Sequence, residues 1–289
     1  MSLVSDLHDV LSREPIDLAR AALVAARIEQ PALDPGPSLD RLAQLGDRAG
    51  EQLSSLTQPT NLARVSALNR LLFEQEGFAG NRAHYDDYRN SLLNVVLDRR
   101  LGIPITLALV YMDVGRRAGV DIDGVAFPGH FLMHVAAHPD RPTGDDGRLI
   151  LDPFDAGKSL DEKACRKLLA LHVGEGAELP LDPALLRPCP PRYMLTRLLN
   201  NLKRAYIDAR SFPQARQVID LMLVVDPTLH SERRDRGLVA YHLDDFPAAL
   251  RDLEDYLAHN RWPEGSGHTE RDQIWEHVKT LRRRVAGLN

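Results

Sequence analysis

The sequence predicts an α+β fold, with a mostly helical N-terminal domain that contains a small antiparallel sheet, followed by an all-α repeat segment. Apolar residues recur every three or four positions through the first hundred residues. The pattern changes to extended structure between Asp121 and Asp152. Beyond it, a spacing of about 34 residues relates two C-terminal segments. We place the domains at residues 1–178 and 192–289, joined by a proline-rich linker at 179–191.

Helical periodicity in the N-terminal domain predicts helices over residues 18–28, 38–53, 61–73 and 91–99. Gly102 is expected to end the last of these, because glycine favours the position just after a helix. Pro104 suits the first turn of the next helix, which should run to about Ala118. Apolar residues cover nearly all of that helix, so we expect it at the centre of the domain.

Three antiparallel strands are expected next, over residues 124–127, 130–135 and 148–152, with a Pro-Gly turn between the first two. Ser159 followed by Glu162 is a capping-box pattern, which predicts a helix that continues to about Leu171.

The C-terminal segment repeats itself. The offset superposes residues of similar size, namely Phe212 on Phe246, Ala215 on Ala249, Ile219 on Leu253 and Leu223 on Leu257. Over residues 198–259 this pattern resembles the tetratricopeptide repeat, with a helix over 269–285 that could cap the array. The alternative is a helical bundle that shares the period by chance.

Stacked helix pairs of the tetratricopeptide type present a concave surface, so the resemblance implies binding of a protein or peptide. The candidate partner-binding residues are aromatic: Tyr206, Phe212, Tyr241 and Phe246.

Composition excludes several classes of protein. Lys plus Arg number 36 and Asp plus Glu 41, a net charge of −5, which argues against nucleic-acid binding and against an anionic membrane surface. The longest apolar stretch, residues 103–112, is about half the length of a bilayer span. Asp6 and Asp9 stand where a signal peptide would be basic and then apolar, so we expect a cytoplasmic protein.

The chain has 2 cysteines, Cys165 and Cys189, too few for a disulfide framework or a cysteine zinc site. Nothing in the sequence indicates a cofactor.

Three motifs follow one another in a meaningful order: Gly102-x-Pro104 at a helix start, Pro128-Gly129-His130 at a strand, and Leu151-Asp152-Pro153 at the end of another strand. This order resembles the transglutaminase-like superfamily, which has a papain-like core. The resemblance implies a catalytic cysteine at the start of the buried helix, a histidine base and an orienting aspartate. His130 and Asp152 match the base and the aspartate, whereas Pro104 occupies the position of the cysteine.

A closer resemblance rests on four segments, Asn90–Asn94, Arg99–Ile105, Pro128–Phe131 and Leu151–Phe154, with the repeats behind them. Together they are similar to the SirB-type bacterial branch of the superfamily, which joins a transglutaminase-like core to tetratricopeptide helices. That branch implies a fold and no defined reaction.

Two other sets of side chains could carry chemistry. Thr106 lies two residues into the central helix and could act as a nucleophile, although a threonine there more often bonds to backbone carbonyls. His130, His134 and His138 recur every four residues, but on a strand that spacing separates successive histidines by about 13 Å, too far for one metal ion. We therefore expect no metal site.

Two functions remain open. In the first, His130 and Asp152 are a relic pair in a non-catalytic scaffold, and the repeats supply a protein-binding, regulatory surface. In the second, the protein is a hydrolase or acyltransferase in which this pair acts on an unidentified nucleophile or on water.

Overall fold

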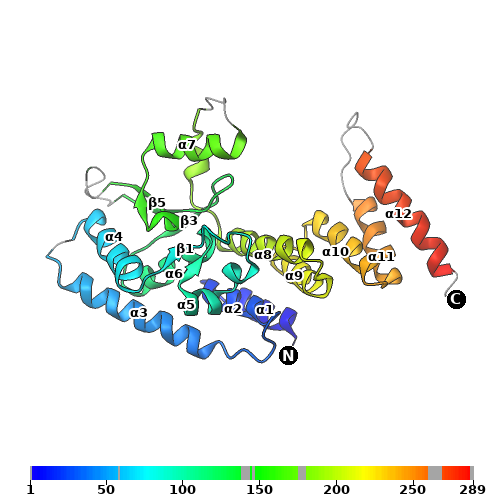
Figure 1. Ribbon diagram of the computed structural model, residues 1–289, viewed down its shortest axis with the longest axis horizontal. Helices are drawn as coiled ribbons and strands as arrows, with labels where there is room; N and C mark the ends of the chain where they lie inside the picture. Colours follow the sequence, from blue (N-terminus) through cyan, green and yellow to red (C-terminus); the bar gives the residue numbers. More distant parts are fainter. Residues whose placement is uncertain are drawn as a thin grey trace. The chain divides into compact units, whose positions relative to one another are not determined.

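A computed structural model of the chain describes residues 2–57, 59–137, 144, 147–174, 180–259 and 269–286 (Figure 1). It divides into two compact units. Residues 13–198 form the core unit, and residues 1–12 together with 199–289 form the repeat unit. The boundary falls at Leu198, inside helix α8 (Pro191–Asp208).

The core unit is built around helix α6 (Pro104–Arg117), which buries eleven of its fourteen residues. Helices α2 (Leu18–Ala26), α3 (Gly36–Ser54) and α5 (Leu93–Arg99) pack against it. Because α6 has few polar residues that could face water, it is stable only where other elements cover most of its surface. The central position expected for this helix is confirmed.

Helix α4 (Asn61–Asn69) continues directly into a π-helical turn (Arg70–Gln75), so that the predicted helix over 61–73 has two parts. Two short strands, β1 (Ala79–Gly80) and β2 (Leu101–Gly102), pair in parallel. They correct one prediction. Arg100, with a left-handed backbone (φ 58°), ends α5, and Gly102 belongs to β2 instead of ending the helix.

The main sheet has four antiparallel strands in sequence order: β3 (Asp123–Val125), β4 (Leu132–Val135), β5 (Leu149–Asp152) and β6 (Lys158–Ser159). One face, with Leu132 and Ile150, packs against helix α7 (Glu162–Val173) and the 3-10 turn Pro183–Leu186. Side chains alternate along a strand, so Met133 and Leu151 occupy the other face, and both are fully buried. The three predicted strands are confirmed, and β6 is an addition.

Two local predictions in this region were wrong. Ser159 lies in β6, and the cap of α7 is Asp161, whose carboxylate accepts the Ala164 N–H at 2.8 Å. His130 lies in the turn before β4, not in the strand itself. That turn requires glycine at position 129. The φ of Gly129 is +65°, which disfavours any residue with a side chain, and a Cβ there would collide with the ring of His172.

The repeat unit contains α1 (Leu3–Leu11), the end of α8, α9 (Phe212–Val225), α10 (His230–His242), α11 (Phe246–His259) and α12 (Thr269–Ala286). The predicted repeat offset relates both the first and the last residues of α9 and α11, and it also relates the last residues of α8 and α10. Superposed residues have the same burial: Ala215 and Ala249 are fully buried, as are Ile219 and Leu253. The predicted repeat is therefore confirmed in its helix boundaries and in its core.

Buried and partly buried ion pairs connect the helices of the repeat unit. Lys203 Nζ lies 2.8 Å from both carboxylate oxygens of Glu232 and 2.8 Å from Asp235. Arg236 bridges Asp220 and Asp252, and its hydrogen bonds to Asp252 raise the pKa of the guanidinium.

Helix α1, which is not among the predicted helices, packs against α9 with Leu7, Val10 and Leu11 buried. In the described ranges, no helix combines the length and the apolar character that crossing a bilayer requires.

Candidate active site

The start of α6 is the position at which a transglutaminase-like nucleophile is expected. Pro104 is the first helical residue there, with Ile103 as the cap. Proline suits this position because its fixed φ is already helical and the missing N–H has no partner inside the helix. The side chain of Pro104 is buried and has no group that can attack or be deprotonated.

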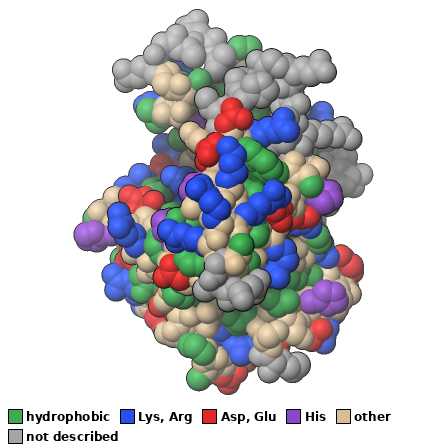
Figure 2. Space-filling view, turned by 90° about the vertical axis from the view of Figure 1, so that its right-hand side faces the viewer, with side chains coloured by type: hydrophobic (Ala, Val, Ile, Leu, Met, Phe, Trp, Pro, Cys, Tyr) green, Lys and Arg blue, Asp and Glu red, His purple; other side chains and the backbone are tan. Residues whose placement is uncertain are grey.

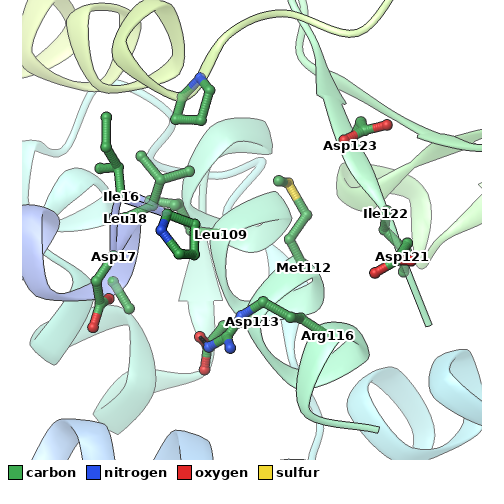
Figure 3. A pocket seen from close by; sticks show the side chains of 13 residues that line it. Ile16, Asp17, Leu18, Leu109, Met112, Asp113, Arg116, Asp121, Ile122 and Asp123 are labelled. Carbon is green, nitrogen blue, oxygen red and sulfur yellow. Dashed lines mark hydrogen bonds and ion pairs between the residues drawn. The ribbon is translucent and has the colours of Figure 1, made fainter. Parts of the chain in front are cut away.

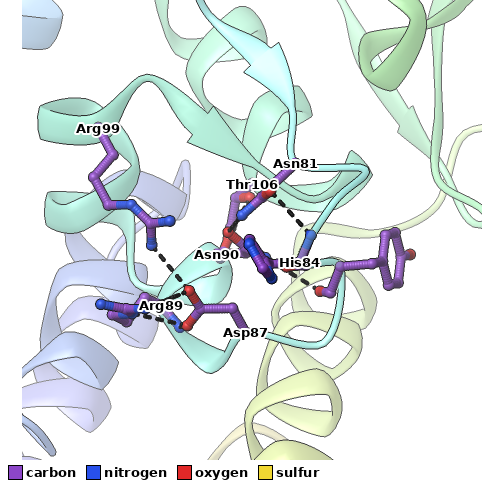
Figure 4. Close-up of polar contacts among 8 residues, drawn as sticks. Asn81, His84, Asp87, Arg89, Asn90, Arg99 and Thr106 are labelled. Atoms are coloured by element: carbon purple, nitrogen blue, oxygen red, sulfur yellow. Dashed lines mark hydrogen bonds and ion pairs between the residues drawn. The ribbon is translucent and has the colours of Figure 1, made fainter.

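The hydroxyl of Thr106 is committed to the backbone. Its Oγ1 accepts the Ile103 N–H at 3.1 Å and donates to the carbonyl oxygen of Asn90 at 2.7 Å, and the side chain is fully buried (Figure 4). Thr106 thus closes the first turn of α6 and attaches it to the preceding segment. Oγ1 also lies 3.1 Å from the carbonyl oxygen of Ile103 at the helix start, but the shorter bond goes to Asn90, outside the helix.

A network of buried amides holds the loop in front of this helix. Asn90 is fully buried, accepts from the Asn81 side chain at 2.9 Å, and donates to the carbonyl oxygens of His84 and Tyr85. Figure 4 shows these groups converging beside Thr106. Sequence reasoning missed this network. Its only signal was Asn90, the first residue of a segment quoted for the family resemblance.

Ion pairs of Asp87 with two arginines also stabilise this loop. Asp87 contacts Arg89 Nε at 2.9 Å and Arg99 at 3.2 Å (Figure 4). Burial opposes ionisation of Asp87, but the hydrogen bonds and charges of the two arginines outweigh it and hold the pKa of the carboxyl below its usual range.

His130 and Asp152 meet as predicted. His130 Nε2 lies 2.9 Å from Asp152 Oδ1, and their side chains are only 15% and 9% exposed. Asp152 Oδ1 also accepts the Phe154 N–H at 2.8 Å. An aspartate acceptor at Nε2 favours the tautomer that is protonated there, which leaves Nδ1 as the nitrogen able to act as a base.

Aromatic and basic side chains surround this pair. Phe154 meets the ring of His130 edge-on at 6.2 Å and that of Tyr85 at 5.7 Å. The guanidinium of Arg82 lies 4.7 Å above Phe154, and Arg197 donates to the backbone oxygen of His130 at 3.2 Å. The turn Pro153–Asp155, which follows Asp152, packs against α6. Through this turn, the segment that follows Asp152 contacts the central helix.

The two thiols lie elsewhere in the core unit. Cys165 is fully buried in the cluster between α7 and the sheet, and Cys189 is held where its N–H donates to the Gly124 oxygen at 2.8 Å. Burial raises the pKa of both thiols, so neither has the thiolate character of a nucleophile.

The histidines do not form a described metal site. His134 pairs across the strands with Asp123, and His138 lies outside the described residues. Within the part of the chain that the structure describes, no three His, Cys, Asp or Glu side chains are grouped as metal ligands would be.

The four aromatic candidates of the repeat unit pack among its helices. Tyr206 is 3% exposed and Phe212 stacks on His242 at 4.4 Å. Tyr241 and Phe246 meet edge-on at 5.9 Å beneath the guanidinium of Arg284, which lies 5.5 Å and 4.8 Å from their rings; a partner-binding role for these residues stays a prediction. A more exposed aromatic residue is Trp275 on α12, 42% exposed, with Arg282 lying 5.3 Å from its ring.

Comparison with known proteins gives the same architecture. Residues 37–200 match the transglutaminase-like superfamily, and residues 202–282 match the tetratricopeptide repeat. A UPF0162 protein of Xylella fastidiosa strain Temecula1 is 39% identical over 249 residues, 84% of each chain. A UPF0162 protein of Pseudomonas aeruginosa is 35% identical over 254 residues, 85% of this chain and 86% of the relative.

A human relative is a longer protein. F-box only protein 21 is 33% identical over 212 residues, which are 72% of this chain but 32% of that protein. The fold, the paired His130 and Asp152 and the matches over both units lead to one conclusion: the chain belongs to the transglutaminase-like superfamily and carries C-terminal tetratricopeptide repeats.

Proposed function

We propose that the protein is a cytoplasmic, non-catalytic scaffold, in which a transglutaminase-like core without a nucleophile accompanies a repeat surface that binds another protein. The observation that carries the proposal is the start of α6. Pro104 cannot attack a carbonyl, Thr106 is buried and bonded to Asn90, and both thiols have raised pKa values.

On this proposal, the His130–Asp152 pair is a structural tie. It links the turn before β4 to the end of β5, and the second bond of Asp152, to the Phe154 N–H, orders the chain where it leaves the strand. A buried imidazole and carboxylate that satisfy each other need no catalytic role to be retained.

The binding surface is expected on the repeat unit. Trp275 and Arg282 are exposed side chains of the types that dominate protein interfaces. Figure 2 shows one face of the molecule on which Lys and Arg lie among Asp, Glu and apolar side chains. Mixed charge of this kind favours a protein partner over nucleic acid, which requires a surface of one sign.

The human relative supports a modular role. In it, the segment similar to this chain is about a third of a longer protein. A scaffold domain is expected to occur in proteins that differ in their other segments, as this core does.

The second candidate function is hydrolysis or acyl transfer, and one observation favours it. The bond between Asp152 and Nε2 leaves His130 Nδ1 able to accept a proton, which is the arrangement a general base needs.

Affinity purification of the full-length chain from cells, with quantitative identification of bound proteins, separates the two. Trp275→Ala should reduce recovery of specific partners by tenfold or more, because exposed tryptophans at interfaces contribute about 2 kcal/mol or more to binding. His130→Ala should leave recovery unchanged. Leu62→Ala is the matched control, since Leu62 is 39% exposed but lies in the core unit.

The reverse pattern contradicts the scaffold. If His130→Ala at normal protein level abolishes the cellular function while Trp275→Ala leaves both partners and function intact, catalysis becomes the better explanation, because a general base contributes about 100-fold or more to rate.

A further inference from the structure

A pocket of about 510 Å³ opens in the core unit between the loop before α2, the second half of α6 and the start of β3 (Figure 3). Met112, which lines it, comes eight positions after Pro104, a separation of about 12 Å along a helix. The pocket is therefore separate from the start of α6.

Apolar side chains form the walls of the pocket. Leu109 and Ile122 are buried, and the half-buried Met112 projects into the space between Ile122 and the wall formed by Ile16 and Leu18 (Figure 3). The volume lies within the range of about 300–1,000 Å³ that is usual for ligand sites, which combine apolar walls with a few polar groups that fix orientation.

The polar groups of this pocket come from the free edge of β3. Among the described strands, β3 is the last of its sheet and pairs only with β4. The carbonyl oxygen of Gly124 points away from β4, since it accepts the Cys189 N–H at 2.8 Å. Successive residues of an antiparallel strand direct their N–H and C=O groups to alternate sides. Ile122, two residues before Gly124, therefore directs both of its backbone groups to the free edge as well.

The backbone of Ile122 lacks partners although the residue is buried. Ile122 is 7% exposed, yet neither its N–H nor its carbonyl oxygen is hydrogen-bonded to any residue that the structure describes. The segment that pairs with Gly124 supplies no donor here, because Cys189 is followed by Pro190 and Pro191, which have no N–H. Buried backbone groups are nearly always paired. An unpaired donor and an unpaired acceptor beside an apolar pocket therefore favour a ligand that carries both.

The charges around the pocket disfavour an anionic ligand. Arg116, the cation among the lining residues, already bonds to Asp113 at 2.8 Å. Asp121 also lines the pocket and is exposed. A carboxylate would thus meet a negative charge and no free cation, so an uncharged ligand fits better.

We propose that the pocket binds one apolar residue of an extended peptide, which adds to the free edge of β3. The side chain of that residue lies against Leu109 and Met112, and its main chain pairs with the N–H and the carbonyl oxygen of Ile122. This is the mode by which peptides extend an exposed sheet edge. The unfavourable charge for a carboxylate assigns the site to an internal residue of the peptide and not to its carboxyl terminus. The site lies in the core unit and goes beyond the proposed binding surface of the repeats, so either can hold without the other.

Methyl NMR of the full chain, isotope-labelled at its methionine methyl groups, tests the proposal. The probe is N-acetyl-leucine methylamide, which places one leucine between two amide groups. Titration should shift the Met112 signal saturably, with a Kd in the millimolar range expected of so small a ligand. The signal of Met222, which is buried in the repeat unit, should not move. Met112→Leu assigns the Met112 signal by removing it.

Two further probes test the hydrogen bonds and the peptide. The matching diester, in which oxygen replaces both N–H groups, should bind at least about fivefold more weakly, the factor that one hydrogen bond contributes. A longer peptide, with alanine on either side of the leucine and the same end groups, should bind at least as tightly as the single residue, because the chain can leave the pocket in both directions.

Leu18→Trp, which narrows the pocket, should weaken binding of the capped leucine while Met112 still reports on it. Leu62→Trp, an exposed change in the first turn of α4, is the matched control and should have no effect. The signal of the fully buried Met133 shows whether each variant is folded, and the diester comparison needs no variant.

Several results overturn the proposal. They are the absence of a saturable Met112 shift at tens of millimolar probe, equal affinity for the amide and the diester, or binding that a folded Leu18→Trp protein retains in full. Binding of the capped leucine without binding of the longer peptide also overturns it, since the pocket would then take a free small molecule and not a peptide.

Discussion

Replacing Thr106 with valine should destabilise the core unit by about 2–4 kcal/mol, because buried polar groups lose their partner. Valine has nearly the shape of threonine, so the change opens no cavity. It removes the hydroxyl that satisfies the Ile103 N–H and the Asn90 carbonyl, both of which are buried. Each buried polar group left without a partner costs about 1–3 kcal/mol. A loss of about 3 kcal/mol corresponds to a fall of about 6–12 °C in the melting temperature of a unit of this size.

The measurement is thermal and urea unfolding of the full chain, following the transition that belongs to the core unit. Thr106→Ser keeps the hydroxyl and should lose about 1 kcal/mol for the missing methyl group. Thr196→Val is a control, because Thr196 donates only to the Arg192 carbonyl on an exposed part of α8, and it should change stability by less than about 0.5 kcal/mol. If the Thr106→Val protein is as stable as the Thr196→Val protein, the hydroxyl of Thr106 does not stabilise the start of α6, and the reasoning is refuted.

Three further results are expected. Pro104→Cys should place a thiol at a helix start, where the pKa is lowered, so it should react with iodoacetamide at pH 6.5 about tenfold faster than Cys189; equal rates count against the superposition on the family. Gly237→Leu should lower the melting temperature of the repeat unit, since even a Cβ would approach Leu253 to 2.8 Å, and overpacking costs about 1–3 kcal/mol; calorimetry checks this. The lowered pKa of Asp87 adds stability above the unfolded-state pKa of about 4, and this stability is lost as the pH falls below that value; urea midpoints from pH 6 to pH 3 should show it, and less so in Asp87→Asn.

Spacing predicted the parts of the fold that repeat or alternate. The repeat offset superposed Phe212 on Phe246, and the structure shows these residues as the first of α9 and α11, because matched small and large residues interdigitate at the same turns of paired helices. Local signals failed where tertiary contacts decide. Asp161 and Ser159 are equally good helix caps by residue type, and the pairing of β6 with β5 selects between them.

The candidate site was predictable in its pair and not in its surroundings. His130 and Asp152 were identified from the order of the motifs, and the structure brings them within 2.9 Å. The amide network of Asn81 and Asn90 joins residues whose spacing follows no helix or strand period, so no pattern could reveal it. Burial of asparagine is also rare enough that sequence alone would place both on the surface.

Lys203 has a consequence for how the repeat unit avoids misassembly. Its counterpart in the next repeat is Gly237, so the two repeats share their apolar positions but differ at this buried one. Apolar surfaces that match so closely could dock one repeat out of step, or onto the same repeat of another molecule. Lys203 meets Glu232 and Asp235 only when the helices are correctly aligned. In a shifted alignment, the ammonium group of Lys203 would be buried without a carboxylate partner, which is costly. The ion pair therefore favours the correct alignment of the helices over shifted ones.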